Sequence, residues 1–372
     1  MAQGALGLRE VLSPGVDNPG DSLYDGFQIV LEDAVRLKDL AAHLGLSVTT
    51  VSRALAGYTD VAPATRRRVL EAAKALGYRP HPLAQRLRRG RTEAVGVVIP
   101  APKGQFADPF FLELLTGLGE ALGEVGLDLL VTACPPGPEE LVCYHHLVEG
   151  RRVDALVVAR TRVQDERILY LLEKGFPFVA HGRSQGVAEP FPFLDMDGTL
   201  GFYRATVHLL EQGHRRIAFI GAPPMFNFAR HRLEGYLWAV REAGLEPPMG
   251  YLRQGDLTEE GGLRAAEALL DLPEPPTAIL AATDRMAWGV LHALKKRGLR
   301  PGRDVSLIGY DDLPFSRYTD PPLSTLRQPF REEGRRLVEL LLGRLEGQPV
   351  AELQEVWVPE LVLRSTDGPA PA

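Results

Sequence analysis

The chain has 372 residues, of which 45% are hydrophobic and 24% charged. This composition is typical of globular proteins, and the length suits two or three domains. No run of 18 apolar residues is present, and the N-terminus lacks the basic start and apolar core of a secretory signal, which excludes a membrane span and predicts a cytoplasmic protein. The two cysteines, Cys134 and Cys143, agree with that compartment, because a disulfide scaffold needs more.

The net charge of −6 is distributed unevenly along the chain. Residues 35–92 contain 12 Lys and Arg against 3 Asp and Glu, whereas residues 1–34 contain one Arg and six acidic residues. A basic segment joined to an acidic remainder indicates a polyanionic partner for that segment, with chance clustering of arginines as the alternative. Residues 1–34 carry SPG and DNPGD breakers, and we expect a disordered extension there.

Three short helices are predicted next, over about 37–44, 48–55 and 63–76. Gly45 provides the turn between the first two, and Ser47 is the expected N-cap of the second. In the third helix Val69 and Leu70 are expected to face inward. Arginines 66–68 crowd its first turns, where they oppose the helix dipole, so we do not expect them to serve helix stability.

From residue 93 onward apolar strands alternate with amphipathic helices. This texture predicts parallel sheets covered on both faces, and the number of strands favours two doubly wound subdomains with a ligand crevice at the carboxyl ends of the strands. The strand candidates are residues 94–100, 127–133, 154–159, 177–182, 216–222, 277–283, 305–311 and 355–363.

The segment LKDLAAHLGLSVTTVSRAL fits a helix-turn-helix, whose second helix places its N-terminal side chains against base edges in the major groove. Val48 and Thr49 stand where base edges are met, and Arg53 can reach a guanine or a phosphate. A small capped helical bundle is the alternative. The DNA-contacting candidates are Ser47, Val48, Thr49, Thr50, Ser52 and Arg53.

Motifs along nearly the whole chain resemble the lac repressor/galactose repressor (LacI/GalR) family of transcriptional regulators. Besides the helix-turn-helix they are DPFF (108–111), GHRRIAFIG (213–221), ARHRLEGY (229–236), ATDRMAWG (282–289), SLIGYDD (306–312) and PPLSTLRQP (321–329). The resemblance implies a helix-turn-helix domain followed by a core like that of periplasmic sugar-binding proteins. It also implies a homodimer on pseudo-palindromic operator DNA, a small effector in the cleft, and no cofactor, metal, enzymatic activity or membrane contact.

The resemblance assigns roles to individual residues. The LAQRL segment implies a hinge that folds on DNA, with Leu87 wedged into the minor groove. In the cleft, Arg230 and Asp311 would hydrogen-bond a sugar, and Phe110 and Phe330 would cover its apolar face, although Arg230 could instead form a structural ion pair and the aromatic rings could be plain core. The effector candidates are Phe110, His181, Arg183, Asp197, Arg230, Thr283, Asp311 and Phe330.

The sequence departs from the family pattern at two places in the cleft. Thr283 replaces a common asparagine, and His181 stands where many members carry an aspartate, for which Asp195 and Asp197 are the expected compensation. HGR together with DMDG is similar to members that sense α-glucosides or other oligosaccharides. Asp284 is expected to cap a helix and not to bind ligand.

These observations predict a repressor whose operator affinity depends on a small effector, with a corepressor as the reverse sign. The alternatives are the sugar-binding module of a transporter, disfavoured by the basic front segment, and a sugar-metabolising enzyme. Neither GLGEALG (117–123) nor Cys143 with His145 and His146 forms a convincing cofactor or metal site. The expected boundaries are 1–34 extension, 35–79 DNA-binding domain, 80–92 hinge, 93–366 core (93–195 with 324–348, and 196–322 with 350–366) and 367–372 tail.

Overall fold

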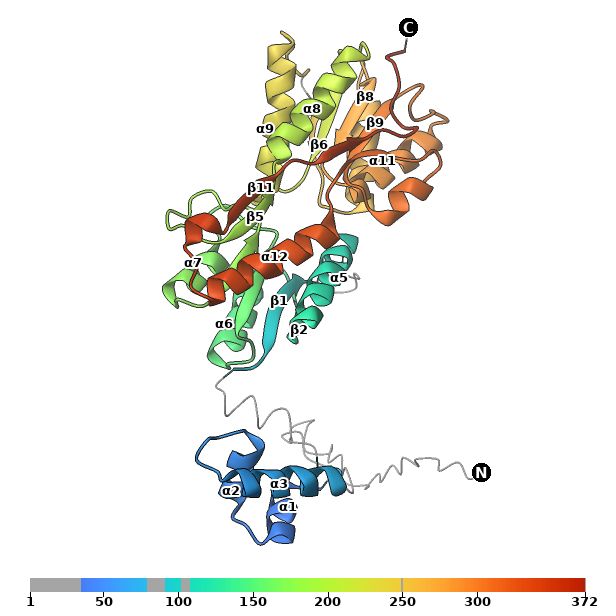
Figure 1. Cartoon of the computed structure of the whole chain (residues 1–372). Helices are drawn as coiled ribbons and strands as arrows, with labels where there is room; N and C mark the ends of the chain where they lie inside the picture. Colours follow the sequence, from blue (N-terminus) through green and yellow to red (C-terminus); the bar gives the residue numbers. More distant parts are fainter. Residues whose placement is uncertain (1–34, 79–90, 102–107, 249, 372) are drawn as a thin grey trace, which may run out of the picture. The chain divides into compact units, whose positions relative to one another are not determined.

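The computed structural model describes residues 35–78, 91–101, 108–248 and 250–371 (Figure 1). The chain divides into two compact units, residues 1–85 and 86–372. Among the described residues, no helix is both long and apolar enough to cross a membrane.

The first unit contains three helices. They are α1 Leu37–Leu44, α2 Val48–Leu55 and α3 Pro63–Ala75. Gly45 adopts φ 65°, a left-handed conformation that turns the chain sharply between α1 and α2. Leu40 and Val51 are fully buried against Val69. The prediction for Leu70 is wrong: its side chain is 50% exposed, because it lies about 100° around the helix from Val69.

The second unit contains two subdomains, each built on a six-stranded sheet. The sheet of the first subdomain has the order β11-β5-β4-β3-β1-β2, and all of its pairings are parallel. Its strands are β1 Ala94–Pro100, β2 Asp128–Cys134, β3 Ala155–Ala159, β4 Phe178–His181, β5 Phe193–Met196 and β11 Gln354–Trp357. Its helices are α5 Pro109–Glu124, α6 Pro138–Glu149, α7 Glu166–Glu173 and α12 Phe330–Leu345. The segment GLGEALG lies within α5.

The sheet of the second subdomain has the order β12-β10-β9-β8-β6-β7, and only the β10–β12 pairing is antiparallel. Its strands are β6 Ile217–Gly221, β7 Leu252–Gln254, β8 Ala278–Ala281, β9 Ser306–Asp311, β10 Ser324–Arg327 and β12 Glu360–Val362. Its helices are α8 Gly198–Glu211, α9 Asn227–Glu242, α10 Glu259–Leu270 and α11 Asp284–Lys296, with the 3-10 turn η1 Pro314–Tyr318. A second 3-10 turn, η2 Val350–Glu352, precedes β11.

Three crossings connect the subdomains, and two differ from the predicted boundaries. Strand β10 pairs with β9 in the second subdomain, so residues 324–327 do not belong to the first. Strand β11 pairs with β5 in the first subdomain, so the predicted single strand 355–363 is divided between the two sheets. The division falls at Pro359, which has no N–H to continue a ladder.

The segment predicted to be a tail begins with packed residues. Thr366 is fully buried, and its hydroxyl donates to the Leu307 carbonyl over 2.8 Å. Asp367 accepts from His208 over 2.9 Å, and the Ala370 N–H donates to the Gln212 carbonyl. The core therefore extends beyond residue 366, because these hydrogen bonds tie the chain end to α8 and β9.

The two cysteines do not remain free thiols. Cys134, at the end of β2, forms a disulfide with Cys143 of α6. The prediction that the cysteine pair indicates a protein without a disulfide framework is therefore corrected at this one position.

Candidate DNA-binding surface and effector pocket

The N-terminus of α2 presents a row of small polar side chains. Ser47 caps the helix, since its Oγ accepts from the Thr50 N–H over 3.0 Å and lies 2.8 Å from the Thr50 hydroxyl. Val48 is 46% exposed, and Thr49 is exposed beside it. Ser52 is half-buried on the same helix. This arrangement leaves the first turn of α2 free to face base edges, as the sequence predicts.

Arg53 is held in place by neighbouring residues. Its guanidinium forms an ion pair with Asp60 and stacks over the Tyr58 ring, with 4.6 Å between the guanidinium carbon and the ring centroid. Because the side chain is 43% exposed, the ion pair orients the arginine while it remains accessible to a phosphate or a guanine.

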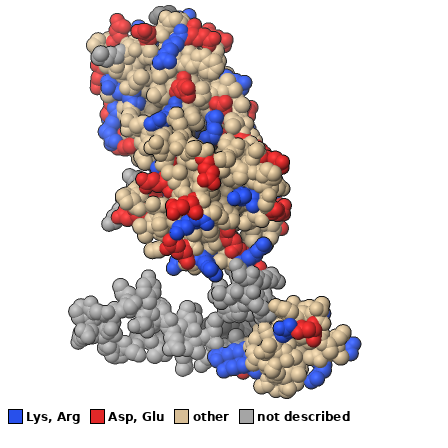
Figure 2. All heavy atoms as spheres, turned by 90° about the vertical axis from the view of Figure 1, so that its left-hand side faces the viewer, with Lys and Arg blue, Asp and Glu red and all other residues tan. Residues whose placement is uncertain are grey.

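The arginines of α3 have a structural role that the sequence analysis did not predict. Arg66 donates to the carbonyls of Gly57 and Tyr58, and Arg68 donates to the Leu44 carbonyl over 3.4 Å. These contacts satisfy carbonyls at the ends of α1 and α2, whereas Arg67 is exposed. Figure 2 shows acidic and basic residues mixed over the visible face of the core. Leu87 lies outside the described residues.

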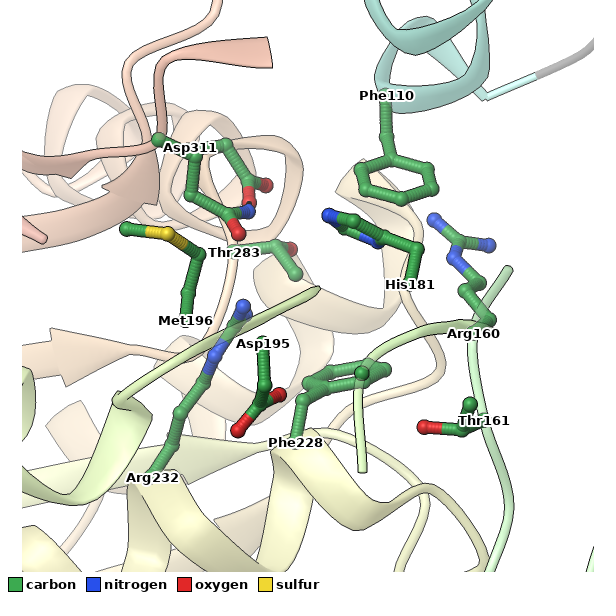
Figure 3. A pocket seen from close by; sticks show the side chains of 12 residues that line it. Phe110, Arg160, Thr161, His181, Asp195, Met196, Phe228, Arg232, Thr283 and Asp311 are labelled. Carbon is green, nitrogen blue, oxygen red and sulfur yellow. Dashed lines mark hydrogen bonds between the residues drawn. The ribbon is translucent and has the colours of Figure 1, made fainter. Parts of the chain in front are cut away.

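A pocket lies between the two subdomains of the core, at the carboxyl ends of their parallel strands (Figure 3). Its empty volume is about 540 Å³, including space open to solvent. The first subdomain contributes Phe110, Arg160, Thr161, His181, Gly182, Asp195 and Met196, and the second contributes Phe228, Arg232, Thr283, Asp311 and Gln328. The strand ends place these residues together, as expected for ligand sites in doubly wound folds.

Arg232 and Asp311 form the charged side of the second subdomain. The Arg232 guanidinium donates to the Ala282 carbonyl and lies 3.5 Å from the Tyr310 ring centroid. Asp311 ends β9 with φ 125°, a conformation that non-glycine residues rarely adopt, and Oδ1 accepts from Gln328 over 2.8 Å. Burial raises the pKa of Asp311 well above its usual range, and the positive charge of Arg232 opposes that shift.

An aromatic wall closes the pocket on the side of the first subdomain. The Phe110 ring meets Phe330 edge to face, with 5.4 Å between centroids, and lies 5.6 Å from the His181 ring. His181 Nε2 lies 2.9 Å from a carboxylate oxygen of Glu333 on α12. Such a ring can cover the apolar face of a sugar, while the imidazole supplies a polar contact beside it.

Two further charged pairs border the pocket. Arg160 donates to Asp108 over 2.5 Å, and Arg183 donates to Asp195 over 2.6 Å. Asp108 also lies 3.6 Å from Arg285 of α11, so this ion pair joins the two subdomains. The positive and negative side chains around the pocket are thus balanced.

Four of the eight predicted effector residues line the pocket, namely Phe110, His181, Thr283 and Asp311. Phe330 lies behind Phe110 and is buried. Arg183 pairs with Asp195 at the rim, and the Asp197 carboxylate accepts from the Leu200 N–H as the N-cap of α8.

Arg230 is not in the pocket, contrary to the prediction. It is exposed, and it donates to the Pro224 carbonyl and to Gln185 over 3.1 and 3.3 Å. Arg232, two residues later in ARHR, takes the pocket position. Residues two apart on a helix lie about 200° apart, so only one of the two arginines can face the cleft.

The cap of α11 also differs from the prediction. Thr283 is the N-cap, and its hydroxyl accepts from the Met286 N–H over 3.3 Å. Asp284 is fully buried one position later, where it accepts from the Leu313 N–H and from Ser316 and Thr325.

Sequence reasoning did not select several lining residues: Arg160, Thr161, Met196, Phe228, Arg232 and Gln328. Arg160 and Thr161 immediately follow a predicted strand, and that position was the available signal. Phe228 and Met196 carried none, because an apolar residue near a strand or helix end is equally typical of the core.

A compact three-helix unit with an exposed, capped second helix, joined to a two-subdomain core that encloses a pocket, defines the class of DNA-binding proteins that carry a small-molecule receptor. Residues 36–81 match the model for bacterial regulatory proteins of the lacI family, and residues 206–366 match the periplasmic binding protein-like domain. The chain belongs to the LacI family, whose members listed among its relatives are helix-turn-helix transcriptional regulators.

Relatives match over nearly their full lengths. The chain is 40% identical to the transcriptional regulator AglR of Rhizobium meliloti, over 91% of this chain and 95% of the relative, and 38% identical to RafR of Escherichia coli, over 87% and 96%. Among solved structures, the CelR–cellobiose complex has a TM-score of 0.68 at 33% identity, covering 89% of this chain and 99% of that chain. The lac repressor dimer bound to operator and an anti-inducer has a TM-score of 0.77 at 27% identity, covering 90% and 99%.

Proposed function

We propose that this chain is a cytoplasmic repressor that binds a pseudo-palindromic operator as a homodimer and releases it when a neutral sugar occupies the pocket. The first turn of α2 meets the bases, with Val48 and Thr49 exposed and Ser47 and Thr50 near the phosphates. The pocket acts as a receptor and carries out no catalysis.

The pocket's balance of charge carries the proposal for the effector. Arg160 is paired with Asp108 and Arg183 with Asp195, and Arg232 and Asp311 face the same cavity. A neutral ligand with many hydroxyls suits this set, because carboxylate and guanidinium groups bind vicinal hydroxyls while Phe110 and Phe228 cover apolar ring faces. The CelR–cellobiose complex among the similar structures supports a saccharide.

The proposed dimer is supported by exposed aromatic residues on η1. Phe315 and Tyr318 are 70% and 78% exposed, three residues apart in a 3-10 turn, where side chains eclipse and form one patch. Exposed aromatic side chains of this size are typical of interface anchors. The structure of the lac repressor dimer on its operator supports the same assembly.

The first test is a fluorescence-anisotropy titration of the full chain on the intergenic DNA upstream of its own gene, repeated with a panel of mono- and disaccharides. We expect nanomolar binding that weakens steeply with salt, because several phosphates are neutralised, and release by one sugar. Binding that one sugar strengthens would identify a corepressor. A flat salt dependence, or full affinity in Arg53→Ala, would contradict DNA binding and favour the transporter module.

A further inference from the structure

One hydrogen bond joins the pocket to a helix that does not line it. His181, at the end of β4, is a pocket residue, and its Nε2 lies 2.9 Å from Oε2 of Glu333. Glu333 is in the second turn of α12 and its side chain is fully buried, whereas that of His181 is 10% exposed. Both residues belong to the first subdomain, so the contact does not depend on closure of the cleft.

The surroundings favour a charged carboxylate and a neutral ring. Glu333 lies close to the N-terminus of α12, which begins at Phe330, and helix N-termini stabilise negative charge. The Arg160 guanidinium lies 5.0 Å from the Phe110 ring, which in turn contacts the His181 ring, so a positive charge already stands on this wall. The consistent arrangement has the proton on Nε2 of His181, donated to Glu333.

This arrangement determines what the other ring nitrogen can do. In a neutral imidazole one nitrogen donates and the other accepts, so a proton on Nε2 makes Nδ1 an acceptor. Among the described residues Nδ1 has no hydrogen-bond partner. The second subdomain carries a further acceptor, Asp311, so a ligand hydroxyl can donate to either side of the pocket.

We propose that Glu333 is a positioning residue that fixes the His181 ring so that Nδ1 accepts a hydrogen bond from an effector hydroxyl. The inference rests on the proposed function, and it identifies a determinant of effector recognition outside the pocket lining. Its chemical consequence is a preference for an effector that presents a hydroxyl donor at the β4 wall over its deoxy analogue.

The first experiment needs no effector. Full-length protein labelled with ¹⁵N-histidine is measured by two-bond ¹H–¹⁵N NMR, with the His181 signal assigned by its loss in His181→Gln. We expect the neutral tautomer with the proton on Nε2. Glu333→Met should move the signal toward the other tautomer or the exchanging mixture, whereas Glu332→Gln, an exposed neighbour on the same helix, should leave it unchanged. A doubly protonated ring, or a spectrum unaffected by Glu333→Met, would overturn the proposal.

The second experiment measures binding of the saccharide that releases DNA in the anisotropy screen, by calorimetry. We expect Glu333→Met to weaken it about 3- to 10-fold, the effect of one misplaced hydrogen bond. Glu333→Gln should largely restore affinity, because its carbonyl oxygen still accepts from Nε2. Thermal unfolding separates the roles: replacing a buried charge by methionine should leave the Tm equal or higher. An affinity loss that Glu333→Gln does not rescue, or that only follows a lower Tm, would contradict positioning.

The two proposals fail in distinguishable ways. If no saccharide releases DNA, the effector class is wrong, while the tautomer measurement still reports on the Glu333–His181 pair. If a saccharide releases DNA but its affinity is equal in wild type and Glu333→Met, the repressor stands and the role of Glu333 is refuted.

Discussion

At the scale of single residues, the choice between Arg230 and Arg232 shows how the cleft obtains its cation. Helix α9 begins at Asn227, and its rotation turns Arg232 toward the Tyr310 ring and the Ala282 carbonyl. Arg230 contacts Pro224 and Gln185 at the surface. One helix therefore supplies one arginine to the pocket and another to the rim.

We expect Arg232→Ala to weaken effector binding about 10- to 100-fold, because a hydrogen bond from a charged donor contributes about 1.5–3 kcal/mol. Arg230→Ala is the matched control and should change affinity less than about 3-fold. Calorimetry with the releasing sugar, together with anisotropy on operator DNA in its absence, checks both. Equal losses in the two variants would place the rim arginine in the site as well.

A second prediction concerns Asp284, whose carboxylate connects the start of α11 with η1 and β10. It accepts from the Leu313 N–H, Ser316 and Thr325, and burial raises its pKa to about 6, although those hydrogen bonds oppose the shift. The folded pKa exceeds the unfolded value of about 3.9. The protonated form is therefore favoured in the folded state, and its contribution to stability is largest at low pH and is lost as pH rises toward 6.

Relative to Asp284→Asn, which does not titrate, the free energy of unfolding of the wild type should fall by up to about 3 kcal/mol between pH 4 and pH 6.5. Urea denaturation of both proteins across that range measures the difference. A constant difference would mean that the carboxyl titrates equally in the folded and unfolded states.

At the scale of elements, α5 and α11 approach each other across the cleft through one carboxylate. Asp108 caps α5 by accepting from the Phe110 N–H over 3.1 Å, and it lies within ion-pair distance of Arg160 in its own subdomain and Arg285 in the other. The Arg285 contact spans the two subdomains, so it is made only when they are close together, and effector binding and this ion pair should support each other.

Arg285→Gln should therefore weaken effector binding about 2- to 5-fold, the effect of a partly exposed ion pair, and the difference from wild type should shrink at high salt. Arg297→Gln is the control, since its partner Asp271 lies within the second subdomain. Calorimetric titrations at two salt concentrations test this. Equal affinity in Arg285→Gln and wild type would show that the ion pair has no part in closure.

At the scale of the whole molecule, DNA binding depends on assembly, because two helix-turn-helix units must meet two half-sites. The aromatic patch of Phe315 and Tyr318 has no other function in the described core, although the Phe315 ring contacts Trp288 edge to face at 6.2 Å between centroids. A patch of this kind loses its exposed area when a second copy covers it.

The double substitution Phe315→Ser and Tyr318→Ser should raise the dimer dissociation constant by at least about 30-fold, since interface anchors contribute about 2 kcal/mol or more. Operator affinity should fall with it, while affinity for the releasing sugar stays within about 3-fold. Light scattering over a dilution series and anisotropy give the two constants. A dimer as tight as the wild type would assign the interface to another surface.

The sequence by itself determined the fold class, the helix-turn-helix and its capped second helix, and the positions of Phe110, His181, Thr283 and Asp311 in the pocket. These follow from local signals: apolar periodicity, a Ser N-cap, a Gly turn, and residues that directly follow apolar strands, together with family motifs. Each depends on neighbours close in the chain, which periodicity and spacing report.

The tertiary structure alone decided which arginine of α9 enters the cleft, that Glu333 reaches His181, and where the chain crosses between subdomains. The strands at the crossings are short and partly polar, so they lack an apolar run, and their sheet is set by pairing with distant strands. The His181–Glu333 contact joins residues 152 positions apart. No local pattern encodes such contacts, because they arise from the packing of α12 beside β4 after both elements have formed.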